Sequence, residues 1–229
     1  MKQNQYIGEN SLYEKRFEHD SCGIGFTANI DGTRSHKIVK NGIQMLINLE
    51  HRGAVGGDQS TGDGGGLLME IPDKFFRKQL NSEFVLPEEG GYAVGMIFFP
   101  ENNKFIERFK QIIADVVENE GAQLLGWRHV PTDKRCLAGL AADTEPVVKQ
   151  VFIGRNNIKK ENFARKLYVL RRQVEKKVNI WKQENDIFYI ASLSEKNIVY
   201  KGLLTGTQLP EYYTDLQDQD FISAFSIIH

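Results

Sequence analysis

Apolar segments of five to ten residues recur along the chain, and patterns with helical spacing separate several of them. This alternation limits the possible folds most, because strands and helices that are apolar on one face must bury those faces in layers. The predicted strands are 22–30, 67–71, 91–100, 123–130, 147–154, 186–194, 197–204 and 221–229. The predicted helices are 36–50, 72–80, 102–120 and 161–183. We therefore expect a layered α+β domain, in which 186–194 and 197–204 form a hairpin.

The composition excludes several classes of partner and location. The 229 residues carry a formal net charge of −1, so no broad surface for nucleic acid is expected. The sequence contains no run of about 18 apolar residues, which a membrane-spanning helix would need. The polar first 20 residues lack the apolar region of a secretory signal. We expect a cytoplasmic protein that binds neither nucleic acid nor membrane.

The chain has two cysteines, Cys22 and Cys136. Two thiols in a cytosolic chain are normally reduced, and the spacing of the cysteines and the five histidines does not match a zinc site. We therefore expect no disulfide and no metal. Cys136 lies in a predicted loop and is interpreted as a bystander.

Cys22 is the candidate nucleophile, in the stretch HDSCGIGF at the start of the first predicted strand. A lone cysteine is usually a small buried apolar residue. Two features favour a reactive role here: Gly23 and Gly25 leave the backbone uncovered, so a ligand can approach closely, and a strand start holds a reacting group rigidly.

A nucleophilic thiol needs a base that takes its proton. His19 and Asp20 reach Cys22 only if the chain turns back on itself, and nothing in the sequence demands that turn. Removal of residues 1–21 would give Cys22 a free α-amino group, whose pKa is about 7.7–8.0 in model peptides. Such a group accepts the thiol proton near neutral pH, so that one residue supplies both nucleophile and base.

The stretch 51–66 contains seven glycines in sixteen residues and is predicted to be a loop. Its last part, GDGGG at 62–66, suggests a phosphate site. However, it lacks the Lys-Ser/Thr pair of a P-loop and the spacing of a dinucleotide-binding turn. A tight turn beside the strand of Cys22 is the favoured interpretation.

These motifs resemble a known family. CGIGF resembles the start of a class II glutamine amidotransferase domain, and LEHRGAVGGDQSTGDGGGLLMEIP at 49–72 resembles the glutamate synthase family. Further similar segments follow in order at 93–100, 124–133, 150–153, 164–172, 188–204 and 212–229. The resemblance implies a leader at 1–21 and a partial glutaminase domain at 22–229. It also implies an N-terminal-nucleophile hydrolase fold, a four-layer αββα sandwich that is incomplete at the C-terminus.

The family pattern also bears on the substrate pocket. The resemblance implies that Arg52 helps to shape the glutamine pocket; the alternative is that its guanidinium pins the glycine-rich loop through hydrogen bonds to carbonyls. Gly65 stands where the family has Ala. The family's Arg-Phe-Ser-Thr-Asn segment, which holds the glutamine carboxylate, and its Asn-Gly oxyanion hole would follow His229. We therefore expect the 229 residues alone to be an incomplete domain.

The function implied by this resemblance is the glutaminase half-reaction of glutamate synthase. Cys22 attacks the side-chain amide of glutamine, ammonia leaves, and hydrolysis of the thioester gives glutamate. In the family the ammonia is transferred to 2-oxoglutarate. FMN and an iron-sulfur cluster are expected in the missing part of the enzyme, and no cofactor in this segment. Expected partners are the remainder of the glutamate synthase chain and a small electron-donating subunit or ferredoxin. The alternative is an inactive, unprocessed fragment that acts only as a folding or interaction piece.

Overall fold

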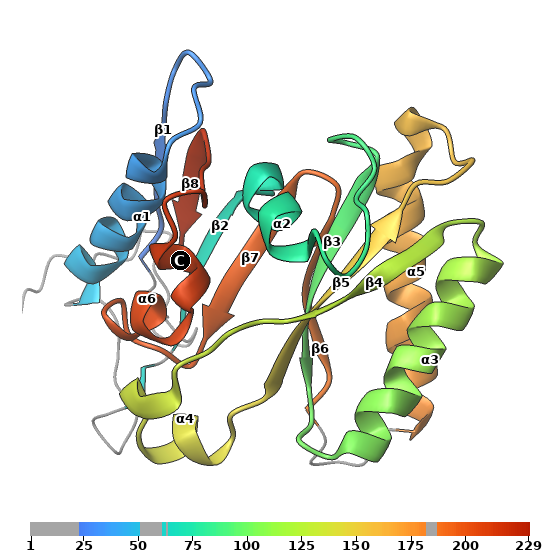
Figure 1. Ribbon diagram of the computed structural model, residues 1–229. Helices are drawn as coiled ribbons and strands as arrows, with labels where there is room; N and C mark the ends of the chain where they lie inside the picture. Colours follow the sequence, from blue (N-terminus) through green and yellow to red (C-terminus); the bar gives the residue numbers. More distant parts are fainter. Residues whose placement is uncertain (1–22, 51–60, 63, 182–186) are drawn as a thin grey trace, which may run out of the picture.

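The computed structural model describes residues 23–50, 61–62, 64–181 and 187–229 of the chain. In these ranges the chain forms two four-stranded antiparallel sheets, which lie next to each other as two layers (Figure 1). The first sheet has the strand order β1-β8-β2-β7 and the second β4-β5-β3-β6. The α+β class expected from the sequence is thus present in the structure.

The first sheet is built from segments far apart in the sequence. Its strands are β1 (Gly25–Ala28), β8 (Phe225–Ile228), β2 (Gly65–Glu70) and β7 (Asn197–Gly202). The helix α1 (His36–Asn48) packs on this sheet. The fit is close at Gly42, where an added Cβ atom would lie 2.8 Å from Leu67 and 2.3 Å from Ser226. Only a residue without a side chain allows this separation between helix and sheet.

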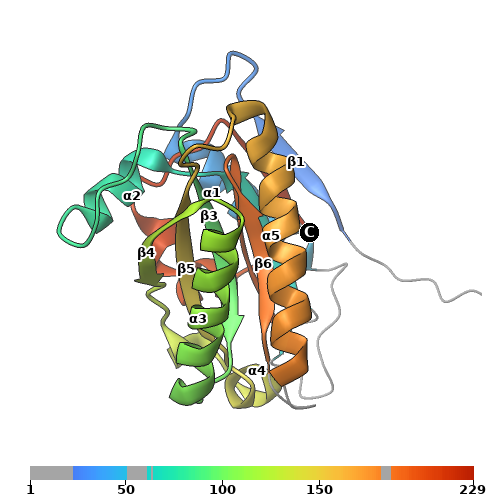
Figure 2. The same cartoon turned by 90° about the vertical axis from the view of Figure 1, so that its right-hand side faces the viewer.

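The second sheet carries a layer of two helices on one face. Its strands are β4 (Gln123–His129), β5 (Val147–Gly154), β3 (Tyr92–Phe99) and β6 (Tyr189–Ser194). The helices α3 (Asn103–Asn119) and α5 (Lys160–Trp181) lie side by side in front of it in Figure 2. One hydrophobic core lies between these helices and the sheet, with Phe109, Val116 and Leu167 at most 1% exposed. The apolar spacing predicted for both helices is therefore the spacing of their buried faces.

A second, larger core contains side chains from both sheets. It also includes residues of the short elements α2 (Asp73–Leu80) and α6 (Gln208–Tyr212) and of η3 (Thr214–Gln217). Two further short elements, η2 (Lys134–Cys136) and α4 (Gly139–Asp143), lie in the connection from β4 to β5. Cys136, predicted to lie in a loop, is therefore the last residue of a short 3-10 helix.

A buried ion pair joins the second sheet to the first. Arg128 on β4 forms two hydrogen bonds of 2.7 Å with Asp215 on η3, and the two side chains are 8% and 3% exposed. Tyr200 on β7 donates to Asp215 at 2.8 Å, and Gln150 on β5 accepts from Arg128 at 2.9 Å and donates to the Tyr200 hydroxyl at 2.9 Å. Each polar group of this network thus has a buried partner, which is the condition under which burial of charge is tolerated.

The network also determines the protonation of its members. Burial would lower the pKa of Arg128, but the hydrogen bonds and the charge of Asp215 outweigh it and raise that pKa. Burial, together with Asp215, raises the pKa of Tyr200 well above its ordinary value. Arg128 therefore stays charged and Tyr200 stays a hydrogen-bond donor.

Two sequence predictions need correction. The segments around β6 and β7 follow each other across a tight connection, but they do not pair as a hairpin: β6 pairs with β3 and β7 with β2. Their side chains are needed in two different cores, which separates them. The predicted loop 51–66 is also too long at its end, because Gly65 and Gly66 belong to β2 and pair with Gly202 and Lys201.

The four-layer detail of the expected sandwich stays a prediction. The structure shows the two sheets and the helix layer formed by α3 and α5. On the first sheet, Phe26 is 76% exposed and Ile227 is 40% exposed, so part of one sheet face is open among the described residues. In the same ranges, none of the helices is long and apolar enough to cross a membrane.

We predict that Asp215→Asn destabilises the protein strongly, because it keeps the shape of the side chain but leaves Arg128 as an unpaired buried charge. The free energy of unfolding should fall by about 3–5 kcal/mol, the usual cost of breaking a buried pair. Urea unfolding followed by tryptophan fluorescence measures this difference.

A matched control is Arg165→Met, which removes the exposed contact between Arg165 and Asn162. This change should alter the free energy of unfolding by no more than about 0.5 kcal/mol. Equal urea midpoints for Asp215→Asn and Arg165→Met would contradict the importance given to the buried pair.

Candidate active site

Three chain segments meet at one end of the strands of the first sheet. Gly25 at the start of β1 and Leu67 near the start of β2 both pair with Ile228 at the end of β8. Gly66 and His229 exchange backbone hydrogen bonds of 2.8 and 3.2 Å. The backbone that leads from Gly23 into β1 is therefore separated from the end of the glycine-rich stretch only by the end of β8.

The two predicted site residues, Cys22 and Arg52, lie outside the described residues. The structure does place their neighbours along the chain. A Cβ atom added to Gly23 would lie 3.0 Å from the side chain of Leu49, just beyond the C-terminal end of α1. The described residue next to Cys22 thus lies against the residue three positions before Arg52.

The segment 204–207 packs against both sides of this region. At Gly62, an added Cβ atom would lie 2.5 Å from the carbonyl carbon of Leu204. At Gly206, it would lie 2.8 Å from the backbone of Leu46 and Ile47 in α1. Separations under 3 Å do not occur for real Cβ atoms, so both positions need glycine to let two backbones approach.

Glu50 and Thr207 add a polar contact between the same parts. One carboxylate oxygen of Glu50 accepts from the backbone N–H of Thr207 at 2.9 Å and from its hydroxyl at 3.2 Å. The hydroxyl groups of Thr205 and Thr207 lie 2.9 Å apart. Gln208 extends the contact, because it accepts from the N–H of Thr205 at 3.0 Å. The 204–207 segment is therefore fixed to the residues that follow α1.

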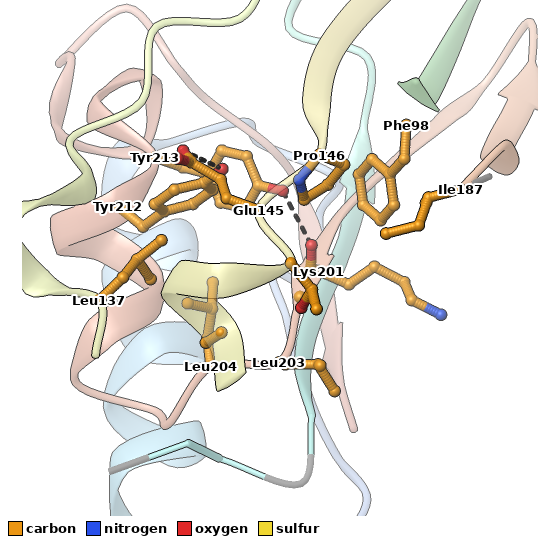
Figure 3. Close-up of a pocket in the computed structure, with 13 residues that line it drawn as sticks. Phe98, Leu137, Glu145, Pro146, Ile187, Lys201, Leu203, Leu204, Tyr212 and Tyr213 are labelled. Atoms are coloured by element: carbon orange, nitrogen blue, oxygen red, sulfur yellow. Dashed lines mark hydrogen bonds between the residues drawn. The ribbon is translucent and has the colours of Figure 1, made fainter. Parts of the chain in front are cut away.

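An apolar cavity of about 190 Å³ borders on this segment at Leu204. Figure 3 shows its lining, with Tyr212 and Tyr213 on one side and Phe98 on another. Tyr212 donates to the carboxylate of Glu145 at 3.1 Å, and Tyr213 donates to the carbonyl of Lys201 at 2.8 Å. Gly202 and Leu204 belong to the same lining, so the cavity borders on residues that contact the glycine-rich stretch.

Cys136 has the properties of an unreactive thiol. Its side chain is partly buried, and its Sγ lies 3.2 Å from the carbonyl oxygen of Asp133. Burial, and then the charge of Glu211, raise the pKa of this thiol. A thiol with a raised pKa is a poorer nucleophile at neutral pH, because only the thiolate attacks.

The described ranges also bear on metal binding. No group of three or more His, Cys, Asp or Glu side chains lies there in a position to hold a metal ion.

Sequence reasoning missed the role of Glu50, Leu204, Gly206 and Thr207. Glu50 lies about 150 residues before the other three in the sequence. Their contacts arise only because the end of β7 lies beside the end of α1. A weak signal was present in the TGT stretch at 205–207, where a glycine between two hydroxyl side chains is typical of a tight turn.

Comparison with known proteins identifies the family. The family model for class-II glutamine amidotransferases matches residues 22–229, so the chain belongs to this family of enzymes. The match begins at Cys22 and confirms the class of enzyme expected from the sequence.

Within this family, the chain is similar to glutamate synthases. The chain is 46% identical to the glutamate synthase [NADPH] large chain of Bacillus subtilis (strain 168), over 100% of this chain and 15% of that protein. It is 36% identical to the glutamate synthase [NADH] of Saccharomyces cerevisiae, over 96% of this chain and 11% of that protein. It is also 36% identical to the ferredoxin-dependent glutamate synthase of Pyropia yezoensis, over 99% of this chain and 15% of that protein. The chain therefore spans about 11–15% of the length of these relatives.

We predict that Gly62→Ala is destabilising, because its Cβ atom would meet the backbone of Leu204, which cannot rotate away as a side chain can. The free energy of unfolding should fall by about 1–3 kcal/mol, the usual cost of overpacking. Thermal or urea unfolding measures the change.

The control for this substitution is Gly25→Ala, whose Cβ atom would make an ordinary 3.4 Å contact with Ile228. It should change the free energy of unfolding by less than about 0.5 kcal/mol. If both alanines are tolerated equally, the close approach at Gly62 does not constrain the fold.

Proposed function

We propose that the chain carries the glutaminase site of a glutamate synthase and that Cys22 is its nucleophile. The observation that supports this most is the similarity to glutamate synthases over the whole chain, joined with the family match that begins at Cys22. The described surroundings are consistent with this proposal. Gly23 and Gly25 carry no side chain that would cover the backbone, and Gly23, the residue after Cys22, lies against the end of α1. An inactive fragment is the less favoured alternative.

In the proposed reaction the α-amino group of Cys22 takes the thiol proton, after residues 1–21 have been removed. The sulfur attacks the side-chain amide carbon of glutamine, and the carbon–nitrogen bond breaks as the proton passes to nitrogen. Ammonia leaves and a thioester remains. Water then attacks the thioester, so that glutamate is released and the thiol is restored.

Arg52 and the glutamine pocket belong to the same proposal. Support for Arg52 comes from the contact between Gly23 and Leu49, which brings the chain neighbours of both residues together. An arginine offers a planar set of donors that suits a carboxylate or an amide oxygen. We also propose that the domain adopts the four-layer αββα sandwich of N-terminal-nucleophile hydrolases; the two sheets and the layer of α3 and α5 fit this arrangement.

The activity of the whole enzyme is likewise a proposal. The names of the relatives include NADPH, NADH and ferredoxin-dependent glutamate synthases. By analogy, ammonia released at this site would be used to convert 2-oxoglutarate to glutamate in the cytoplasm. The remainder of a glutamate synthase chain would be the partner, with an electron-donating subunit or ferredoxin. FMN and an iron-sulfur cluster would be held outside the present 229 residues.

We predict that 6-diazo-5-oxo-L-norleucine, a glutamine analogue with a reactive diazo ketone, labels Cys22 selectively in the full-length protein encoded by the gene. Peptide mass spectrometry identifies the labelled cysteine. Cys22→Ser should abolish labelling and glutaminase activity, whereas Cys136→Ser should retain both, because the Cys136 thiol is partly buried and its pKa is raised. Labelling at Cys136 would refute the assignment.

We further predict that a free amine at Cys22 is required. Mass spectrometry of the active protein should show Cys22 as its first residue. A variant in which Met1–Ser21 remains attached should react with the diazo ketone at least about 100-fold more slowly, since a positioned general base contributes about 10²–10⁴-fold. Undiminished labelling of a chain that begins at Met1 would contradict the α-amino mechanism.

A further inference from the structure

We propose that Glu50 and Thr207 are positioning residues for the nucleophile: their hydrogen bonds fix the end of α1 against which the backbone next to Cys22 rests. This inference rests on the proposed function, because it concerns the reactivity of the thiol at Cys22. It assigns a role to two residues that do not contact the substrate themselves.

The backbone next to Cys22 rests on the residue that follows α1. Gly23, the residue after Cys22, packs so closely on Leu49 that an added Cβ atom would be 3.0 Å away. Leu49 in turn caps α1, with its N–H 3.1 Å from the carbonyl oxygens of Met45 and Leu46, and it packs on the larger core. The position of the backbone at Gly23 therefore depends on the position of Leu49.

Glu50, which follows Leu49 directly, is anchored to Thr207. The Glu50 carboxylate accepts two hydrogen bonds from Thr207, one from the main chain and one from the hydroxyl. Hydrogen bonds to an ionised acceptor are the stronger ones. Glu50 is exposed at this point, so the anchor adds little to global stability, but it restrains the direction in which the chain leaves the helix.

The segment that contains Thr207 is itself held in place by further contacts. Gly206 lies against the backbone of Leu46 and Ile47, one turn before Glu50. The side chain of Gln208 binds the Thr205 N–H at 3.0 Å and the Cys136 carbonyl at 2.9 Å. A restraint is useful only if its far end is fixed, and the 204–207 segment meets this condition.

The expected consequence concerns reaction geometry rather than folding. A nucleophile must be held close to its productive geometry, and loss of a supporting contact often costs rate without loss of structure. Glu50→Ala should therefore reduce the reaction with a glutamine-like reagent, which needs an oriented thiol. It should not reduce the reaction with a small alkylating reagent, which the thiolate of Cys22 can attack without a fixed orientation.

The test compares two reagents on the full-length protein with Cys22 as its first residue. For Glu50→Ala, the second-order rate constant for labelling by 6-diazo-5-oxo-L-norleucine should fall about tenfold, which corresponds to about 1.4 kcal/mol. The rate constant for alkylation of Cys22 by iodoacetamide should stay within about twofold, a free-energy difference well below that value. Thr207→Val, which keeps the backbone N–H but loses the hydroxyl, should give a smaller decrease.

Two further variants separate positioning from a general structural effect. Glu50→Gln keeps an oxygen that accepts from Thr207 and should restore most of the rate with the diazo ketone. Gln44→Ala removes an exposed hydrogen bond to Asn48 on the same helix and should leave both rates unchanged.

The outcomes separate this inference from the function on which it rests. If the diazo ketone does not label Cys22 in the unsubstituted protein, the proposed function fails, and this inference fails with it. If it labels the unsubstituted protein and Glu50→Ala equally fast, only the positioning role is overturned. Equal loss with Glu50→Gln and Glu50→Ala, or an equal fall in the iodoacetamide rate, would also overturn it.

Discussion

The buried pair of Arg128 and Asp215 is the interaction on which the arrangement of the two sheets depends. It joins β4 of the second sheet to η3, and Tyr200 extends it to β7 of the first sheet. A displacement of the sheets that separated the pair would leave a buried charge without a partner, which costs about 3–5 kcal/mol. The pair therefore places the end of β7 and the 204–207 segment that follows it. The candidate site, at one end of the strands of the first sheet, thus depends on the buried contact between Arg128 and Asp215.

The segments around the candidate site are held together by close approaches between their backbones. Gly62 and Gly206 admit the 204–207 segment between the glycine-rich stretch and α1, and Gly23 lets the backbone that leads into β1 approach Leu49. Larger side chains at these positions would separate the segments. The glycines at 23, 62 and 206 therefore serve the close packing of backbones as much as access for a substrate.

Periodicity predicted most elements well, because a helix or strand that lies on a core must be apolar on one face. Strand β5 and the helices α3 and α5 follow the predicted ranges to within two residues. The partner strands of β6 and β7 were not predictable in this way. Nearness in sequence favoured a hairpin between them, whereas burial in two cores placed them in different sheets. The contact of Glu50 with Thr207 was equally hidden, since nothing local to either residue indicates the other.

The sequence by itself determined the family and the candidate nucleophile. These depend on the order of short motifs and on the residue types that carry the chemistry, namely Cys22 followed by two glycines, and the HRGA stretch that contains Arg52. Only the tertiary structure decided which segments support the site, because those contacts join residues about 150 positions apart. A one-dimensional pattern records which face of an element is buried, but the partner of that face is chosen by packing in three dimensions.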